Sequence, residues 1–222
     1  FFEAKKLFTN SHVVKDRLKK FNDIDSQVLF PPLGLLERCY TADYSNYILY
    51  VSRVTQHKRQ MLAVEALRYT ATPVRLIIAG GVDPGQEFYL SELYAIIRSY
   101  QLEDRVQITA RWISDSEKSD LFANCLAAIY MPYDEDSYGY PSLEAHHSKK
   151  AVITTLDAGG TLELINDGEN GFVTRPDPAE LANAMDKLYS DRALAKKMGE
   201  AGARRVTELG ITWDHVVEQM LS

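Results

Sequence analysis

Two carboxylates lie eight positions apart in the stretch Asp-Ser-Tyr-Gly-Tyr-Pro-Ser-Leu-Glu, which runs from Asp136 to Glu144. Gly139 allows a tight backbone turn between them, and Pro141 favours the first turn of a helix. Amide groups at a helix start have no intrahelical partner and attract phosphate. A phosphate held there, beside carboxylates that accept hydrogen bonds from hydroxyl groups, would suit a nucleotide-sugar. Acidic groups near a helix start also stabilise it by ~0.3–1 kcal/mol without any ligand, which is the alternative interpretation.

Two cations, Arg53 and Lys58, are five positions apart after the apolar stretch 47–52. In a loop at the end of a buried strand, facing a helix start, they would hold a diphosphate and neutralise the charge that develops as it leaves. His57 and Arg59 belong to the same turn, so a solvated basic turn without a ligand is the alternative. Spacing alone leaves both interpretations open.

A glycine pair provides a third candidate, in the segment 157–163. Gly159, Gly160 and Thr161 precede an expected helix start, where backbone amides could meet phosphate or sugar oxygens. Two adjacent glycines are a weak signal alone. The histidines lack metal-ligand spacing, so we expect no metal site and interpret them as surface or packing residues, namely His57, His146 and His147.

Alternating strands and helices must position these groups from residue 46 onward. Apolar runs typical of buried parallel strands occur at 47–52, 75–79, 106–109, 127–131, 151–154 and 171–173. Helices are expected near 61–67, 87–100, 115–123, 141–147 and 162–165, as two segments over 178–209 capped by Asp177 or Asp191, and at 212–221. The alternation predicts an α/β fold with a Rossmann-like parallel sheet and helices on both faces. Ligands bind such sheets at the carboxyl ends of the strands.

Residues 1 to about 45 differ in character from the rest. Apolar residues among lysines and arginines, at mostly helical spacing, predict a helix or helix pair over 2–21 with a break or cap at Asn10-Ser11. A short strand at 28–30 ends at Pro31-Pro32, and the polar stretch 37–46 is typical of a linker. We therefore predict a domain boundary near residue 40.

Composition excludes some classes of function. A net charge of −6 over 222 residues argues against nucleic acid as a partner, because a phosphate backbone requires a clustered basic face. Cys39 and Cys125 are far apart and lack CxxC spacing, which favours reduced thiols. No apolar run approaches the ~20 residues of a membrane-spanning helix. Because the chain opens on Phe1-Phe2 without methionine, we expect a piece of a longer protein.

Taken together, these stretches resemble the C-terminal, donor-binding domain of glycosyltransferase family 4, whose members are retaining enzymes of the GT-B fold. The resemblance covers most of residues 46–222, and the motifs occur in the family's order. They are ILYVSRVTQHK (48–58), RLIIAGG (75–81), VQITARWISDSE (106–117), DSYGYPSLEA (136–145), KKAVITT (149–155) and AGGTLELINDGENGF (158–172). Residues 1–45 resemble the end of the family's N-terminal, acceptor-side domain, most of which is absent.

The resemblance implies a role for each candidate residue. Arg53 and Lys58 would hold the donor diphosphate. Glu144 would bind the ribose hydroxyls, and Asp136 would contact the transferred sugar. Further donor-site positions would be Ser137, Tyr138, Gly139, Gly159, Gly160 and Thr161, with Ile113 beside Trp112 near the base. The resemblance implies no metal ion and no cofactor.

Three positions depart from the family's pattern. Asp136 replaces the usual glutamate and is one methylene shorter, so the sugar contact or the sugar itself could differ. Arg59 replaces a glycine that follows the lysine. Ser148-Lys149-Lys150 replaces a turn of small residues. None of these changes removes a charged group that the implied mechanism needs.

We therefore expect a hexosyltransferase that moves a sugar from a nucleotide-sugar to a hydroxyl acceptor with retention, in glycan or polysaccharide assembly. A glycan or lipid-linked acceptor would bind mainly to the missing domain, so we expect this chain alone to be inactive or nearly so. By analogy with polysaccharide-assembly members, a cytoplasmic enzyme, peripheral at the inner membrane face, would fit. Two alternatives stay open: a nucleotide-sugar epimerase or hydrolase of the same fold, and a non-catalytic carbohydrate-binding module.

Overall fold

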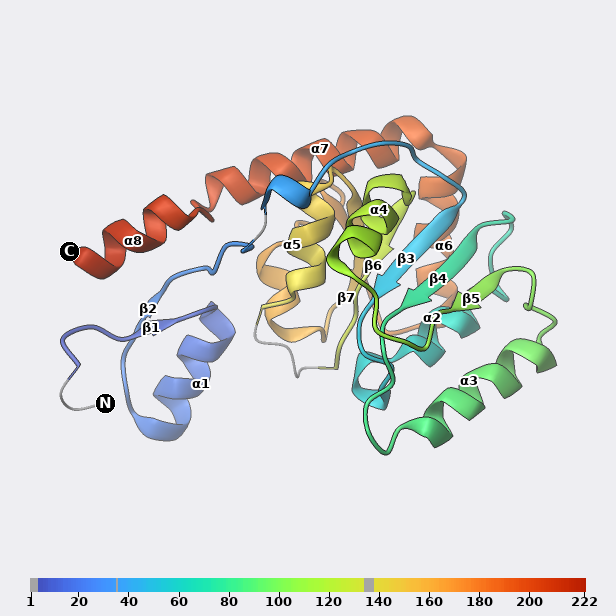
Figure 1. The fold of residues 1–222 in the computed structure, drawn as a ribbon, viewed down its shortest axis with the longest axis horizontal. Helices are drawn as coiled ribbons and strands as arrows, with labels where there is room; N and C mark the ends of the chain where they lie inside the picture. The colour runs from blue at the N-terminus through green and yellow to red at the C-terminus, as the bar shows by residue number, and fades with distance from the viewer. Residues whose placement is uncertain (1–3, 35, 134–137) are drawn as a thin grey trace.

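The computed structural model describes residues 4–34, 36–133 and 138–222. Six parallel strands form the main sheet, in the order β5-β4-β3-β6-β7-β8 (Figure 1). These strands are β3 Tyr47–Val51, β4 Arg75–Ala79, β5 Val106–Ile108, β6 Ala127–Ile129, β7 Ala151–Thr155 and β8 Gly171–Thr174. The accompanying helices are α2 Gln60–Ala66, α3 Glu87–Ser99, α4 Asp115–Asn124, α5 Tyr140–His147, α6 Pro178–Ser190, α7 Arg192–Glu208 and α8 Trp213–Leu221. Short 3-10 turns are η1 Leu36–Arg38, η2 Gln56–Lys58 and η3 Gly159–Glu163.

The central strands are buried on both faces, as their apolar runs predict. In β3, Ile48 and Tyr50 belong to a hydrophobic cluster that includes residues of α2, α3 and α6. Leu49, between them, belongs to a second cluster with residues of α4 and α5. Because successive strand residues face opposite sides of a sheet, each side requires its own layer of helices. The predicted α/β fold, a Rossmann-like parallel sheet with helices on both faces, is confirmed.

β3 and β6 are neighbours in the sheet although β4 and β5 separate them in the chain. The chain runs outward from β3 to β5 and then returns to β6, from which it continues to the opposite edge. At such a switch point the two loops diverge and leave a crevice at the carboxyl ends of the strands, where ligands of open α/β sheets bind. The loop after β3 contains Arg53 and Lys58, and the loop after β6 leads into α5. Two of the candidate stretches therefore flank this crevice.

The N-terminal region contains a strand that the sequence did not predict. Phe8–Thr9 forms β1, which pairs in parallel with β2 at Gln27–Val28, and a single helix, α1 His12–Asn22, connects them. The prediction of a helix or helix pair over 2–21 is thus wrong for its first half. A two-residue strand carries no periodicity, and its partner is distant in sequence. Ser11 caps α1 by accepting from the amide of Val14, as expected for a cap at this position.

The segment between η1 and β3 is fastened to the sheet-containing part. Tyr44 donates its hydroxyl proton to the carbonyl of Lys149 at 2.7 Å, and the ammonium of Lys150 donates to the carbonyl of Asp43.

At the other end of the chain, α7 and α8 run along one edge of the molecule, and α8 reaches over β1 and β2 (Figure 1). The predicted caps Asp177 and Asp191 both accept amide hydrogen bonds, at the starts of α6 and α7. The division into domains at residue 45 stays a prediction.

Candidate functional site

The two predicted cations occupy different environments at the end of β3. The side chain of Arg53 is 67% exposed and pairs with Asp83, with 2.9 Å between Nη1 and Oδ1. Lys58 is only 7% exposed, and its Nζ lies 5.4 Å from the ring centroid of Tyr130, just beyond β6. The Lys58 ammonium is therefore buried beside the end of β6. A solvated basic turn describes Arg53 but not Lys58.

Helix α5 begins at Tyr140 without a side-chain cap. Gly139 precedes it with φ of +85°, in the left-handed region that glycine tolerates, and Pro141 occupies the first turn. Tyr138 is 1% exposed, and its ring stacks on Phe30 at 5.7 Å between centroids. Its hydroxyl has no hydrogen-bond partner among the described residues. In this first turn Pro141 has no amide hydrogen and the Ser142 amide donates to the Gly139 carbonyl at 3.0 Å, so Tyr140 is the residue whose amide could meet a phosphate at the positive end of the helix. Asp136 and Ser137 lie outside the described residues.

The glycine pair lies directly against this helix start. Gly159, Gly160 and Thr161 belong to η3, and a Cβ added at Gly139 would lie 2.7 Å from Oγ1 of Thr161. The hydroxyls of Thr161 and Ser142 are buried and have no partner among the described residues. Buried polar atoms in native proteins are nearly always hydrogen-bonded, to water where protein offers no partner. The two predicted stretches thus meet at Gly139 and Thr161, and each contains a buried hydroxyl without a partner among the described residues.

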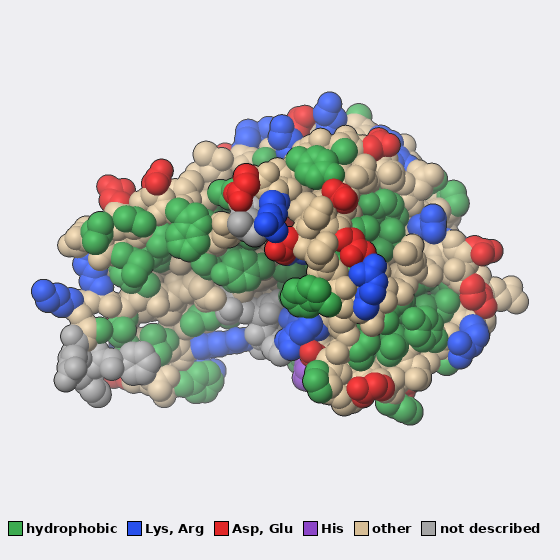
Figure 2. Space-filling view, viewed as in Figure 1, with side chains coloured by type: hydrophobic (Ala, Val, Ile, Leu, Met, Phe, Trp, Pro, Cys, Tyr) green, Lys and Arg blue, Asp and Glu red, His purple; other side chains and the backbone are tan. Residues whose placement is uncertain are grey.

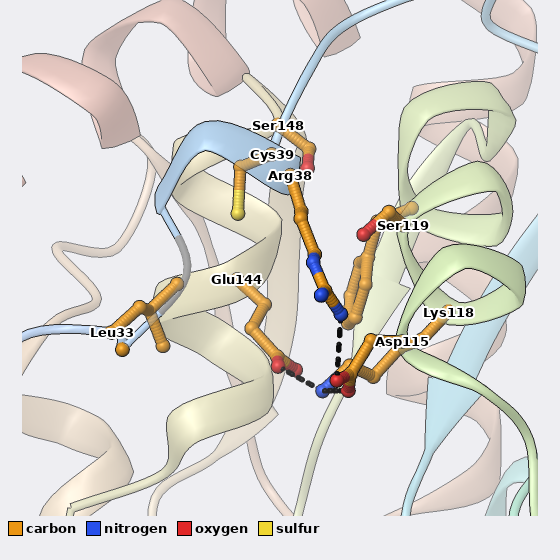
Figure 3. Close-up of a pocket in the computed structure, with 10 residues that line it drawn as sticks. Leu33, Arg38, Cys39, Asp115, Lys118, Ser119, Glu144 and Ser148 are labelled. Atoms are coloured by element: carbon orange, nitrogen blue, oxygen red, sulfur yellow. Dashed lines mark hydrogen bonds and ion pairs between the residues drawn. The ribbon is translucent and has the colours of Figure 1, made fainter.

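Glu144, on the second turn of α5, forms an ion pair that the sequence did not predict. Its Oε1 lies 2.6 Å from Nζ of Lys118 on α4, and the two side chains are 15% and 29% exposed. Burial raises the pKa of the Glu144 carboxyl, while Lys118 lowers it and Asp115 raises it again. The pair lines a cavity of about 190 Å³ between α4, α5 and the segment around η1 (Figure 3). Glu144 therefore lines the cavity, and its carboxylate can still accept hydrogen bonds from a ligand there.

A second cavity, of about 340 Å³, opens at the ends of β3 and β4. Its lining includes Arg53, Gly80 and Ile113, and it shares Asp115 and Lys118 with the first cavity. A Cβ added at Gly80 would lie 2.1 Å from the backbone oxygen of Ser52, so the close approach of the chain after β3 to the end of β4 requires glycine here. The shared residues make the two cavities neighbours along one rim. Figure 2 shows this face hollowed beside the N-terminal elements, with Lys and Arg side chains at the edge.

Arg59 makes contacts that the sequence did not predict. Its guanidinium donates to the carbonyls of Met131 and Pro132, to the hydroxyl of Thr155 and to both carboxylate oxygens of Asp157, at 2.7–3.1 Å. The sequence marks Arg59 only as a departure from a glycine. The structure gives it φ of +54°, the left-handed conformation that explains why glycine suits the position. Arg59 therefore joins the ends of three neighbouring segments behind the site.

Glu163 closes η3 and contacts the N-terminal helix. Its Oε2 lies 2.7 Å from Nδ1 of His12, and its Oε1 accepts from the amide of Val13 at 3.1 Å. The carboxylate thus stands at the positive end of α1, where acidic groups are favourable. The described residues include no group of three or more His, Cys, Asp or Glu side chains placed to hold a metal ion. Within the same residues, every helix is too short or too polar to cross a bilayer.

Comparisons with known proteins identify the family. The profile of a family described as "Glycosyl transferases group 1" matches residues 41–205. The human protein named alpha-1,3/1,6-mannosyltransferase ALG2 is 31% identical over 218 residues, which cover 88% of this chain and 51% of that protein. Its counterpart in Dictyostelium discoideum is 32% identical over 181 residues, covering 75% and 42%. The chain spans about half the length of these curated relatives.

Solved structures share the fold. HepE from Anabaena, in complex with UDP and glucose, superposes with a TM-score of 0.86 at 21% identity, covering 99% of this chain and 63% of that one. The C-terminal domain of the group 1 protein LpcC from Francisella tularensis gives a TM-score of 0.69 at 24% identity, covering 78% of this chain and 96% of that domain. The sheet therefore matches the C-terminal domains of GT-B glycosyltransferases. Because the family profile spans most of the chain, the chain belongs to the glycosyl transferases group 1 family.

Proposed function

We propose that this chain is the donor-binding part of a retaining, nucleotide-sugar-dependent glycosyltransferase of family 4. The observation that carries the proposal is the arrangement at the β3–β6 switch point. Buried Lys58 comes from one side of the crevice, and the uncapped first turn of α5 at Gly139 comes from the other. An ammonium and the positive end of a helix dipole on the two sides of one crevice favour a phosphate group.

Each part of a nucleotide-sugar has a complementary group along this rim. The diphosphate would contact Lys58 and Arg53 at the start of α5, and the two cations would neutralise charge as the nucleoside diphosphate leaves. The ribose hydroxyls would donate to Glu144. The base would enter the cavity lined by Ile113. In the transfer step, the bond from the sugar's anomeric carbon to the diphosphate oxygen breaks, a bond to the acceptor hydroxyl's oxygen forms on the same face, and the hydroxyl proton passes to the departing diphosphate.

The transferred sugar is a hexose, and mannose is the first candidate. Two of the most similar curated relatives are named mannosyltransferases, and HepE is described in complex with UDP and glucose. The chain covers about half of such relatives, so the acceptor, a glycan or a lipid-linked glycan, would bind largely to the remainder of a longer protein. From the family resemblance, the role that we propose for Asp136, Ser137 and Tyr138 is contact with the sugar. We also propose that the protein associates peripherally with a membrane.

Calorimetry of nucleoside diphosphates and of the matching nucleosides tests the site. Lys58→Met should weaken diphosphate binding about 10- to 100-fold, the range expected for one charged hydrogen bond, and leave nucleoside binding unchanged. Glu144→Gln should weaken the binding of both the nucleoside diphosphate and the nucleoside. Lys197→Met, an exposed lysine on α7, is the matched control and should change neither. Unchanged diphosphate binding to a Lys58→Ala, Glu144→Ala double variant would refute the site.

A second measurement identifies the donor. A thermal-shift panel of nucleotide-sugars should raise the melting temperature most for the natural base and sugar, since a ligand bound by the native state stabilises it. We propose transfer without a metal ion, because Arg53 and Lys58 already supply the positive charge. Binding should then be the same with and without EDTA. Product analysis on a longer form of the protein, with its acceptor, tests retention at the anomeric carbon.

A further inference from the structure

We propose that Lys118 is a positioning residue that holds the Glu144 carboxylate ionised and correctly oriented for the donor's ribose. The inference rests on the proposed function, in which Glu144 accepts from two ribose hydroxyls. It assigns a role to a side chain that carries no motif of its own in the sequence. The ion pair between Lys118 and Glu144, at 2.6 Å, is its geometric basis.

Lys118 belongs to a chain of alternating charges that crosses three elements (Figure 3). Its Nζ also lies 3.7 Å from Oδ1 of Asp115, one turn earlier on α4. The other oxygen of Asp115 accepts from Arg38 in η1, at 2.9 Å. Arg38, Asp115, Lys118 and Glu144 thus connect the segment before β3 to α4 and α5. Because the Lys118 ammonium is held between Asp115 and Glu144, it restricts the orientation of the Glu144 carboxylate.

The surroundings of Glu144 make a neighbouring cation necessary. Burial raises the pKa of this carboxyl, and Asp115 adds to the increase, whereas Lys118 opposes both. Burial also raises the pKa of Cys39 to about 11, so this facing thiol is neutral near pH 7. On α5 itself, burial lowers the pKa of His147, which therefore adds little positive charge. Arg38 is directed to Asp115, so Lys118 is the cation in direct contact with the carboxylate.

Ionisation decides how many hydroxyls Glu144 can accept from. A carboxylate presents two oxygens that only accept, whereas a protonated carboxyl converts one of them into a donor. Two neighbouring ribose hydroxyls need two acceptors, so protonation of Glu144 would cost ribose affinity. Removing Lys118 should therefore shift the pH at which donor affinity is lost toward neutrality.

The test is calorimetric binding of UDP, as a defined probe, between about pH 5 and pH 8. Lys118→Met keeps the aliphatic stem and removes the charge. Its affinity should be within about threefold of the unsubstituted protein at pH 8 and should then fall about tenfold per pH unit, beginning at a higher pH than in the unsubstituted protein. Lys118→Arg restores a cation and should restore the original pH profile. Titration of the UDP phosphate is common to all variants and cancels in their ratios.

Other outcomes overturn the inference. An equal loss at every pH would mean that Lys118 does not act through the ionisation of Glu144, and an unchanged profile would mean that it has no role in binding. Glu144→Gln separates this inference from the proposed function, because it should bind weakly and show no pH dependence beyond that of UDP. If Glu144→Gln binds like the unsubstituted protein, the ribose contact itself is wrong. Lys197→Met is the lysine control, and thermal unfolding at each pH confirms that every variant is folded.

Discussion

Arg59 donates to both carboxylate oxygens of Asp157, each at 2.9 Å, and so joins the turn after β3 to the turn after β7. Bidentate pairs of this kind fix the relative position of their partners. Arg59 makes this contact from φ of +54°, a conformation that costs a residue with a side chain about 1–2 kcal/mol. Backbone strain of this type persists where the surroundings over-determine it, and such positions cluster at functional sites. The pair therefore fixes two loops that border the proposed donor site.

Arg59→Gly should destabilise the protein despite relieving the strained backbone. Glycine recovers about 1 kcal/mol at this φ, but the substitution removes hydrogen bonds to two carbonyls, a hydroxyl and a carboxylate, each contributing about 1 kcal/mol. We expect a net loss of about 3 kcal/mol in the free energy of unfolding, measured by urea denaturation. UDP affinity should also fall, because the loops at 131–133 and 155–157 lose their common anchor.

A double-mutant cycle with Asp157→Asn isolates the pair. The coupling energy should be at least ~0.5 kcal/mol, as for contacting residues in one hydrogen-bond network. A more stable Arg59→Gly variant with unchanged UDP affinity would show that strain outweighs the contacts and that the loops do not depend on Arg59.

Gly139→Ala should impair both stability and ligand binding. Its φ of +85° strains any side chain, and the new Cβ would lie 2.7 Å from Oγ1 of Thr161. We expect more than the ~1–2 kcal/mol that the backbone conformation alone would cost, and a weaker affinity for UDP. Gly168→Ala is the matched control, because Gly168 has φ of +74° with nothing within 4 Å of the added Cβ. Equal effects of both substitutions on UDP binding would contradict a role for the Gly139–Thr161 contact.

The main sheet could be predicted from the sequence because its strands are buried on both faces. The residues Arg75–Ala79 form β4 with the bounds that the apolar run predicts. Helix starts could also be predicted where a short polar side chain caps the helix, as Asp177 and Asp191 do. Such signals are local, and the packing of the sheet agrees with them.

The contacts within the site could not be predicted in the same way. Lys118 and Glu144 are on different helices, and their ion pair depends on how α4 and α5 pack on one face of the sheet. In the sequence, Arg59 is notable only because it replaces a glycine of the family's pattern. Its five hydrogen bonds join it to residues about 70 to 100 positions away. The resemblance placed Lys58 near a diphosphate, yet only the fold shows that this lysine is buried beside Tyr130.

Glu163→Gln should loosen α1 from the donor-side loop. The Glu163 carboxylate contacts the ring of His12 and the amide of Val13, so it connects η3 to the start of α1. The amide of glutamine can still accept from Val13, but it lacks the charge that favours a helix N-terminus. Hydrogen exchange of the amides at Val13 and Val14 should become severalfold faster, as measured by NMR or mass spectrometry.

An exposed glutamate at the end of α7 offers the control for this exchange experiment. Glu208→Gln should leave the α1 amides unchanged. If Glu163→Gln also leaves them unchanged, then other contacts of this region hold α1, such as the stacking of Phe30 on Tyr138.

Stability should fall in acid because His146 is buried without charge. Burial lowers its pKa to about 4, although its ring contacts the carbonyl of Lys150. Between about pH 6.5 and pH 4 the unfolded chain binds a proton that the folded chain excludes, so stability present at pH 7 is lost as pH falls, by on the order of 3 kcal/mol. Urea denaturation should show a flatter pH dependence for His146→Gln than for His215→Gln, the control on α8. Glu144 titrates with the opposite sign in all these proteins and cancels in the differences, so equal slopes for the two variants would contradict the prediction.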